Sequence, residues 1–253
     1  MAKRTEGQRR AGAPRPAWAV RTLLALGVLW LTPSLGLAAA LSAEDVAARI
    51  EAAGDRPTDL AGLDLTGLDL AGVKLKGADL RGSLLNHADL EGTDLTGANL
   101  DLVILRDANL KGATLRRVSA FQAVFSGADL TGADFRGAEI VAKFERSNLE
   151  GANLAGANLA ADMTNQSMGL MRAHLTKANL KGANLAGATL ARCTAEFADF
   201  SGADLKGADL SRCELAGANF AGADLTGADF TGADLQGAKL DEAIGRAQAI
   251  GLD

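Results

Sequence analysis

The amino-acid sequence predicts an all-β solenoid, in which short extended segments wind into one closed coil. A large apolar residue recurs at every fifth position from Leu60 to Ile140, and again from Leu175 to Leu240, where only Ala120 and Ala195 depart from the pattern. Glycine accounts for 30 residues, whereas aromatic residues make up only 4% of the chain. A long helix is excluded, because apolar residues five apart would advance by about 140° each and would spiral around its axis.

Residues 1–40 precede the repeats and differ from them in composition. They carry six basic residues and one acidic residue, whereas the rest of the chain carries 20 basic and 30 acidic residues. Basic residues, the apolar run 23–31 and the alanines 38–40 follow one another in the order of a secretory signal peptide. An uncleaved anchor over residues 22–43 is the alternative, because about 20 apolar residues can span a bilayer. We expect a protein exported to the periplasm or the cell exterior, or one anchored in the inner membrane.

Residues 41–57 predict a short amphipathic helix before the repeats. Ser42 is a candidate N-cap, Asp45 lies in the first turn, and Val46 and Ile50 are four residues apart. Gly54 marks the end of the helix. We expect this helix to cover the apolar end of the solenoid.

The repeating unit over residues 58–240 explains why the coil must be closed. In the unit Ala78, Asp79, Leu80, the small and the large residue are two apart, so they point the same way in extended backbone while the acid points away. A following Gly permits a bend. Only a coil buries both apolar positions of every unit, and stacked neighbours then form one continuous core.

Units such as Ala203, Asp204, Leu205, Lys206, Gly207 resemble those of the pentapeptide-repeat proteins. The resemblance implies a right-handed quadrilateral β-helix with four units per coil. Residues 58–240 would then form about nine coils, stacked at about 4.8 Å each. The best understood members of that family resemble duplex DNA and protect gyrase-type topoisomerases, and many others have no assigned activity.

Two interruptions disturb the five-residue register. One lies near 141–148 and shortens the spacing by one residue, and the other lies over 160–172. Their errors cancel, which indicates local distortions within one solenoid. Residues 160–172 hold Met163, Met168 and Met171, which either patch an irregular core or form a partner-binding loop. Residues 241–253 are expected to cap the C-terminal end, with Ile244 and Ile250 on a closing helix.

The sequence offers little chemistry. It has two histidines, His87 and His174, which the coil places far apart, so we expect isolated surface side chains and no metal site. A nucleophile, a base and an orienting residue cannot be assembled from the remaining residues. We therefore expect no enzyme and assign no catalytic, cofactor-binding or metal-binding residue.

An apolar ridge is the first candidate contact surface. Leu84, Ile104 and Val124 occupy outward positions, are spaced by 20 residues and should stack in one column. Phe144 continues this column if the missing residue falls after it. Such a strip is either covered by the chain itself, for example by the segment from Ala160, or it contacts a protein or a membrane surface. In the same stretch, four residues replace Gly at corners: Leu102, Asp107, Arg117 and Gln122.

Arg172, Arg192 and Arg212 are also spaced by 20 residues and should form a basic column at one corner. Acids such as Glu196 or Glu214 must lie nearby to offset the repulsion. The column is either a solvated, partly neutralised edge or a site for an anion or an acidic partner.

Cys193 and Cys213 share the same spacing at the small inward position, so we expect them to be neighbours on successive coils. Stacked strands hold their Cβ atoms about 4.8 Å apart, which is wider than the 3.8 Å or so that a disulfide prefers. This thiol pair has three possible states: two buried free thiols, a strained disulfide, or a pair with a redox function.

Two functional classes fit these features. The first is an exported scaffold that binds an unknown protein, a second copy of itself included, and the second is an acidic mimic of DNA that binds an enzyme such as gyrase. Export favours the scaffold, because a topoisomerase is cytosolic. A membrane-anchored envelope solenoid is a further variant. We expect no cofactor, no binding of nucleic acid, and membrane contact only if the N-terminal segment is retained.

Overall fold

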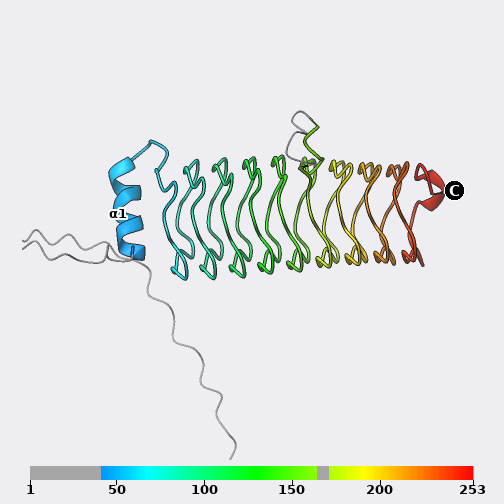
Figure 1. The fold of residues 1–253 in the computed structure, drawn as a ribbon, viewed down its shortest axis with the longest axis horizontal. Helices are drawn as coiled ribbons and strands as arrows, with labels where there is room; N and C mark the ends of the chain where they lie inside the picture. The colour runs from blue at the N-terminus through cyan, green and yellow to red at the C-terminus, as the bar shows by residue number, and fades with distance from the viewer. Residues whose placement is uncertain (1–40, 164–170, 253) are drawn as a thin grey trace, which may run out of the picture. The chain divides into compact units, whose positions relative to one another are not determined.

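Short extended segments stack into four parallel ladders in this computed structural model, which describes residues 41–163 and 171–252 (Figure 1). Ladder A starts at Asp59, ladder B at Asp64, ladder C at Asp69 and ladder D at Lys74, and in regular coils each residue pairs with the one 20 positions later. Each extended side contributes one bridging residue. The expected signal peptide or anchor, residues 1–40, lies outside the described residues.

The core runs along the inside of all four ladders. Both inward positions of a unit are buried, as Ala78 and Leu80 are, while Asp79 between them faces outward. Larger aromatic residues stack where they occupy the same position on successive coils. The rings of Phe125 and Phe144 are parallel, with centroids 4.9 Å apart.

Outward Asp and Asn side chains stabilise the corners that follow them. Asp59, for example, accepts a hydrogen bond of 3.1 Å from the backbone N–H of Ala61. On ladder C every outward residue from Asp69 to Asn219 accepts such a bond from the residue two positions later. The recurring Asp and Asn therefore serve the backbone, since they cap a turn that Gly then completes.

Helix α1, Ala43–Ala53, precedes the first coil. Ser42 and Asp45 form a reciprocal capping box, and Val46 is fully buried in the same core cluster as Leu60. No helix among residues 41–163 and 171–252 is long and apolar enough to cross a membrane.

The expectation of a closing helix at the C-terminus is wrong. Ile244 pairs with Asp224, and Ile250 pairs with Asp229, so both residues continue the ladders. The backbone N–H groups of Leu225 and Phe230 donate to the carbonyls of Ile244 and Ile250, and these bonds hold the last segment extended. Only a single turn, the 3-10 helix η1, Arg246–Gln248, separates the two isoleucines.

Both interruptions of the repeat lie at one corner, which connects ladder A to ladder B and is called corner A–B. Regular copies of this corner contain two residues, such as Ala61 and Gly62. Between Ile140 and Ala142 it contains Val141 alone, and between Leu159 and Ala173 it contains residues 160–172. The solenoid therefore continues through both sites, and the changes are confined to one edge.

Candidate interaction face

Ladder B departs from the other three ladders in the residues that it presents outward. Ladder C carries Asp or Asn at every outward position before Lys239. From the second to the eighth coil, ladder B instead presents a mixed series: Leu84, Ile104, Val124, Lys143, His174, Thr194 and Glu214. Only its end residues, Asp64 and Asp234, accept the bond that caps the corner. The fold does not require the capping bond at these seven positions, because ladder B continues through them without it.

Leu84, Ile104 and Val124 pair in succession and form the expected apolar strip. All three side chains are half-buried, because each is shielded by its neighbours in the column. Phe144 does not continue the strip, and this expectation is wrong. The repeat is one residue short before Phe144, at the corner that contains Val141 alone. Phe144 therefore points inward and is fully buried. Lys143 takes the outward place.

Backbone strain is concentrated at the two corners that border ladder B, namely corner A–B and corner B–C, which leads to ladder C. Eleven non-glycine residues within the described ranges adopt a positive φ, and nine of them lie at these two corners. They are Leu102, Gln122, Arg192 and Arg212 at corner A–B, and His87, Asp107, Arg146, Lys177 and Phe197 at corner B–C. Each costs about 1–2 kcal/mol relative to Gly. Strain of this kind clusters at functional sites.

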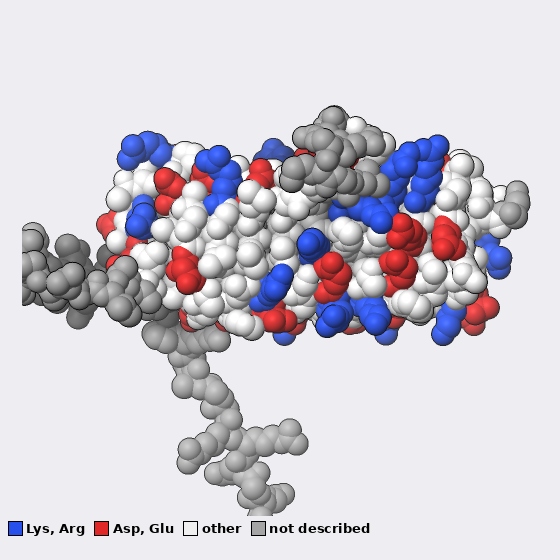
Figure 2. Space-filling model, viewed as in Figure 1, with Lys and Arg blue, Asp and Glu red and all other residues white. Residues whose placement is uncertain are grey.

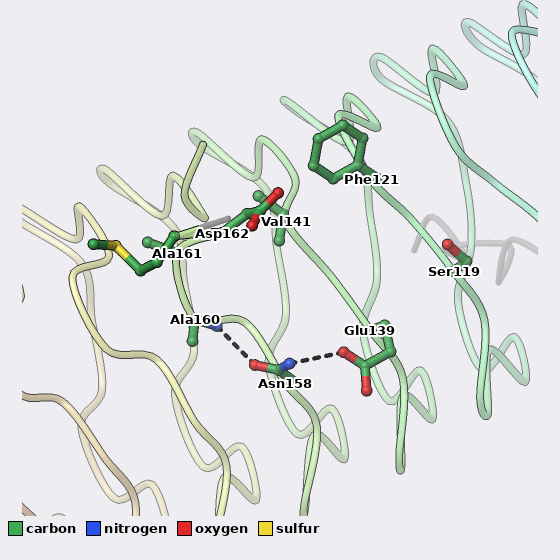
Figure 3. Close-up of a pocket in the computed structure, with 9 residues that line it drawn as sticks. Ser119, Phe121, Glu139, Val141, Asn158, Ala160, Ala161 and Asp162 are labelled. Carbon is green, nitrogen blue, oxygen red and sulfur yellow. Dashed lines mark hydrogen bonds between the residues drawn. The ribbon is translucent and has the colours of Figure 1, made fainter. Parts of the chain in front are cut away.

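A pocket of about 410 Å³ opens at corner A–B, where the corner is shortened. Phe121 forms one wall, and the first residues after Leu159 form another (Figure 3). On its floor Asn158 donates to Glu139 at 2.7 Å and accepts from the N–H of Ala160 at 3.1 Å. The complete lining is Ser119, Phe121, Glu139, Val141, Asn158, Ala160, Ala161, Asp162 and Met163.

The described residues on either side of 164–170, namely 160–163 and 171–172, lie at the surface of the solenoid. Met163 is 45% exposed and lines the pocket, and Met171 is half-exposed, where the amide nitrogen of Gln122 contacts its sulfur. Asp162 pairs with Met171, so the segment leaves and rejoins the corner as two adjacent limbs. Neither Met163 nor Met171 therefore patches the core, whereas Met168 lies outside the described residues.

The three arginines Arg172, Arg192 and Arg212 occupy corner A–B on successive coils. Arg172 forms an ion pair of 2.7 Å with Glu214, one of the two acids expected nearby, and contacts the carbonyl of Arg192 at 3.5 Å. Figure 2 shows basic side chains gathered toward the C-terminal half of this view of the rod.

Cys193 and Cys213 lie beneath ladder B as free, buried thiols. The Cys193 thiol donates to the sulfur of Cys213 at 2.8 Å, and the Cys213 thiol donates to the carbonyl of Leu190 at 3.0 Å. Ser83 donates to the carbonyl of Leu60 in the same geometry, so a thiol here replaces a small hydroxyl residue. The bond to Cys213, together with complete burial, raises the pKa of Cys193 well above its usual range.

The two histidines lie on different coils, His87 at corner B–C and His174 on ladder B. Thr194 lies within hydrogen-bond distance of His174 Nδ1, at 3.0 Å. Partial burial lowers the pKa of His174, and this effect outweighs the opposing charge of Glu145. No cluster of three metal-ligating side chains occurs within the part of the chain that the structure describes.

Comparison with known families explains the repeat. The model of the pentapeptide repeats matches eight copies, which fall within residues 58–161 and 170–244. The chain belongs to the pentapeptide-repeat family. Its fold is accordingly a right-handed β-helical solenoid, and members of this family are generally non-enzymatic scaffolds.

Several solved pentapeptide-repeat structures are similar to the chain. HetL from the cyanobacterium Nostoc sp. strain PCC 7120, involved in regulation of heterocyst differentiation, is 29% identical over 83% of this chain and 94% of that chain, with a TM-score of 0.34. QnrB1, a plasmid-mediated fluoroquinolone resistance protein, is 25% identical over 72% of this chain and 90% of that chain, with a TM-score of 0.40. No curated protein matches significantly.

Part of this face could not be found from the five-residue period alone. The same corner as His87, corner B–C, also holds Arg146, Lys177 and Phe197 on later coils. This alignment follows only when the one-residue deletion near 141 and the insertion over 160–172 are both assigned to corner A–B. The available signal was the replacement of Gly at these positions. The pocket has no sequence signal, because its walls come from three successive coils and the inserted segment.

Proposed function

We propose that this protein is a non-enzymatic, exported binding module, and that ladder B, with the described residues of corners A–B and B–C, forms its contact surface for another protein. This surface is called the B face. The observation that carries the proposal is the coincidence of two costs on one face: ladder B lacks the capping bond of the repeat in seven successive coils, and nine strained residues border this ladder. Natural proteins retain such costs where function requires them.

Export is the second part of the proposal. It rests on the order of basic, apolar and small residues over 1–40. N-terminal sequencing of the protein from fractionated cells tests it, because cleavage after Ala40 in the periplasmic or secreted fraction is expected. An intact N-terminus in the membrane fraction would favour the anchor over residues 22–43, and an intact N-terminus in the cytosol would contradict export.

We also infer that the four ladders make a quadrilateral coil, and that α1 caps its N-terminal end. The four ladders and the buried Val46 support this. Leu60 of the first coil is fully buried, whereas Leu235 and Leu240 of the last complete coil are only partly buried. The N-terminal end is therefore the better covered of the two.

Mimicry of DNA would use the acidic columns of the other ladders, and it fits less well. On those ladders the carboxylates and amides accept hydrogen bonds from their own backbone, so the fold accounts for them. A supercoiling assay with purified gyrase tests this alternative, and protection of the enzyme would support it.

The contact surface is tested by Leu84→Asp, Ile104→Asp and Val124→Asp combined. We expect the variant to fold, since Asp is the usual residue of the repeat and its carboxylate can cap the next corner. Circular dichroism and the melting temperature should stay unchanged, while partners cross-linked to the wild type in cells should be lost. The matched control is Asp94→Asn, Thr114→Asn and Asp134→Asn on ladder D, in the same coils. Equal loss in both variants, or loss in neither, would contradict the B face.

A further inference from the structure

We infer that the partner of the B face presents an acidic protein segment that lies along the axis of the rod, with apolar side chains toward the N-terminal coils. This inference rests on the proposed function and names the chemistry of its partner. It follows from an asymmetry along the B face: the outward residues of ladder B are apolar from Leu84 to Val124 and polar or charged from Lys143 to Glu214.

The cations in the second half of the B face are arranged as two rows. Arg172, Arg192 and Arg212 follow corner A–B, and Arg146 and Lys177 follow corner B–C on the other side of ladder B. The track between the rows begins with Lys143 and His174. Of the Lys and Arg residues named here, only Arg172 forms an ion pair within the described chain. Arg116 and Arg136, on another part of the rod, both pair with Asp134.

The acids of the same region are already engaged by the rod. Glu145 accepts a hydrogen bond from the Ser126 hydroxyl at 2.7 Å, and Glu196 accepts one from the Thr176 hydroxyl at 2.7 Å. Glu214 is held by Arg172. Hydrogen bonds from neutral hydroxyls leave Glu145 and Glu196 charged. The net charge on this half of the B face is nevertheless positive, although the chain as a whole carries −5, because these three carboxylates are outnumbered by six cations: Lys143, Arg146, Arg172, Lys177, Arg192 and Arg212. Complementary charge on a partner must be negative.

The length of the B face along ladder B sets the length of the partner segment. Leu84 and Glu214 are six steps apart on ladder B, which spans about 29 Å at about 4.8 Å per step. A helix of about 20 residues, or an extended segment of about nine residues, covers this distance.

A protein segment fits this surface better than a polyanion or a lipid surface. A nucleic acid carries phosphates along its whole length, so part of them would lie over the apolar side chains of Leu84, Ile104 and Val124. The ladder residues of the apolar strip are half-buried, so they form a flat contact and cannot insert into a bilayer. A partner that is apolar in one half and acidic in the other meets both halves.

The test uses the full-length chain and a synthetic helical peptide of about 20 residues, with a leucine stripe in one half and glutamates in the other. Binding is measured by fluorescence anisotropy against the same peptide with every Glu changed to Gln. We expect the Glu peptide to bind about tenfold more tightly or better, and to weaken as salt is raised. Equal binding of both peptides, or no binding of the Glu peptide at about 1 mM, would overturn the inference.

Two protein variants locate the site. Arg146→Gly, Lys177→Gly, Arg192→Gly and Arg212→Gly together restore the usual corner residue of the repeat, and should weaken the peptide about tenfold without loss of folding. The matched control removes four cations that form no ion pair among the described residues and lie off the B face: Lys74→Gln, Lys76→Gln, Lys181→Gln and Lys239→Gln. A loss of equal size in the control would show that net charge alone drives binding, and would refute the inference.

Failure of this inference differs from failure of the proposed function. If the triple Asp variant of the apolar strip loses its cellular partners while the Glu peptide does not bind, the B face is a contact surface for a different class of protein. Binding of duplex DNA or of vesicles containing phosphatidylglycerol to the cation rows, without binding of the Glu peptide, would assign those rows to a phosphate ligand and would overturn the acidic protein segment.

Discussion

The ring of Phe197 lies over the backbone of Gly217, the residue at the same corner on the next coil. A Cβ atom at position 217 would lie 2.6 Å from the Phe197 ring. Both residues have left-handed backbone, with φ of 58° at Phe197 and 67° at Gly217. An exposed aromatic residue at this corner therefore depends on the glycine of its neighbour, and the coupling can be measured.

Gly217→Ala is expected to destabilise the solenoid by about 2 kcal/mol, from left-handed strain and from displacement of the Phe197 ring. Phe197→Gly should be neutral or stabilising, because it removes strain from an exposed residue. In the double variant, only the strain at position 217 should remain. Chemical denaturation of the four proteins gives the coupling free energy, and simple additivity would show that the ring does not rest on this corner.

Leu102→Gly should raise stability by about 1 kcal/mol. Leu102 has φ of 62° and is 59% exposed, so the change relieves strain while it removes little packing. The matched control is Gly92→Leu, at a regular corner with φ of 64°, which should lower stability by a similar amount. Thermal unfolding followed by circular dichroism measures both, and a loss of stability in Leu102→Gly would mean that its side chain packs against the rod.

The thiols of Cys193 and Cys213 should be unreactive in the folded protein. Both are buried, and the raised pKa of Cys193 keeps its nucleophilic thiolate scarce at neutral pH. Ellman's reagent should label neither thiol in the native state and both in denaturant. A deficit of about two mass units in the non-reduced native protein would instead reveal a disulfide, and the coils would then have to shift to form it.

Cys213→Ser should preserve stability to within about 1 kcal/mol, because the new hydroxyl can donate to the carbonyl of Leu190 as Ser83 donates to Leu60. Cys213→Val places a larger side chain at a small inward position and serves as the destabilising control. Similar losses in both variants would argue against the shared geometry.

Protonation of His174 should destabilise the folded chain. Burial lowers its pKa below the usual 6.5, so the unfolded chain binds the proton more readily than the folded one. Its contribution to stability is therefore complete above about pH 6.5 and declines as the pH falls through the window below it. Five groups contact it or influence its charge: Thr194, Glu145, Arg172, Lys143 and Glu196.

NMR titration should give His174 a midpoint below 6.5, and His174→Gln should reduce the loss of stability on mild acidification. The same titration in Glu145→Gln should lower the midpoint further, since the charge of Glu145 favours the protonated form. A midpoint above 6.5 in the wild type would contradict the role of burial.

The repeat itself determined most of the fold, because five-residue periodicity with alternating small, polar and large residues admits only a closed coil. Spacing by 20 residues then placed Cys193 beside Cys213, and Leu84 beside Ile104. These relationships are local and identical in every coil, so they can be predicted from the sequence without any knowledge of packing.

Only the tertiary structure decided where the register breaks. A single missing residue between Ile140 and Leu149 fits several positions equally well by periodicity, and the parallel stacking of Phe144 on Phe125 selects Val141. That choice turns Phe144 inward, puts Lys143 on the surface and brings Arg146 and Lys177 into line along corner B–C. The concentration of positive-φ residues on one face also could not be predicted from the sequence. It depends on which corners lie side by side on neighbouring coils, and the packing of the whole core determines that arrangement.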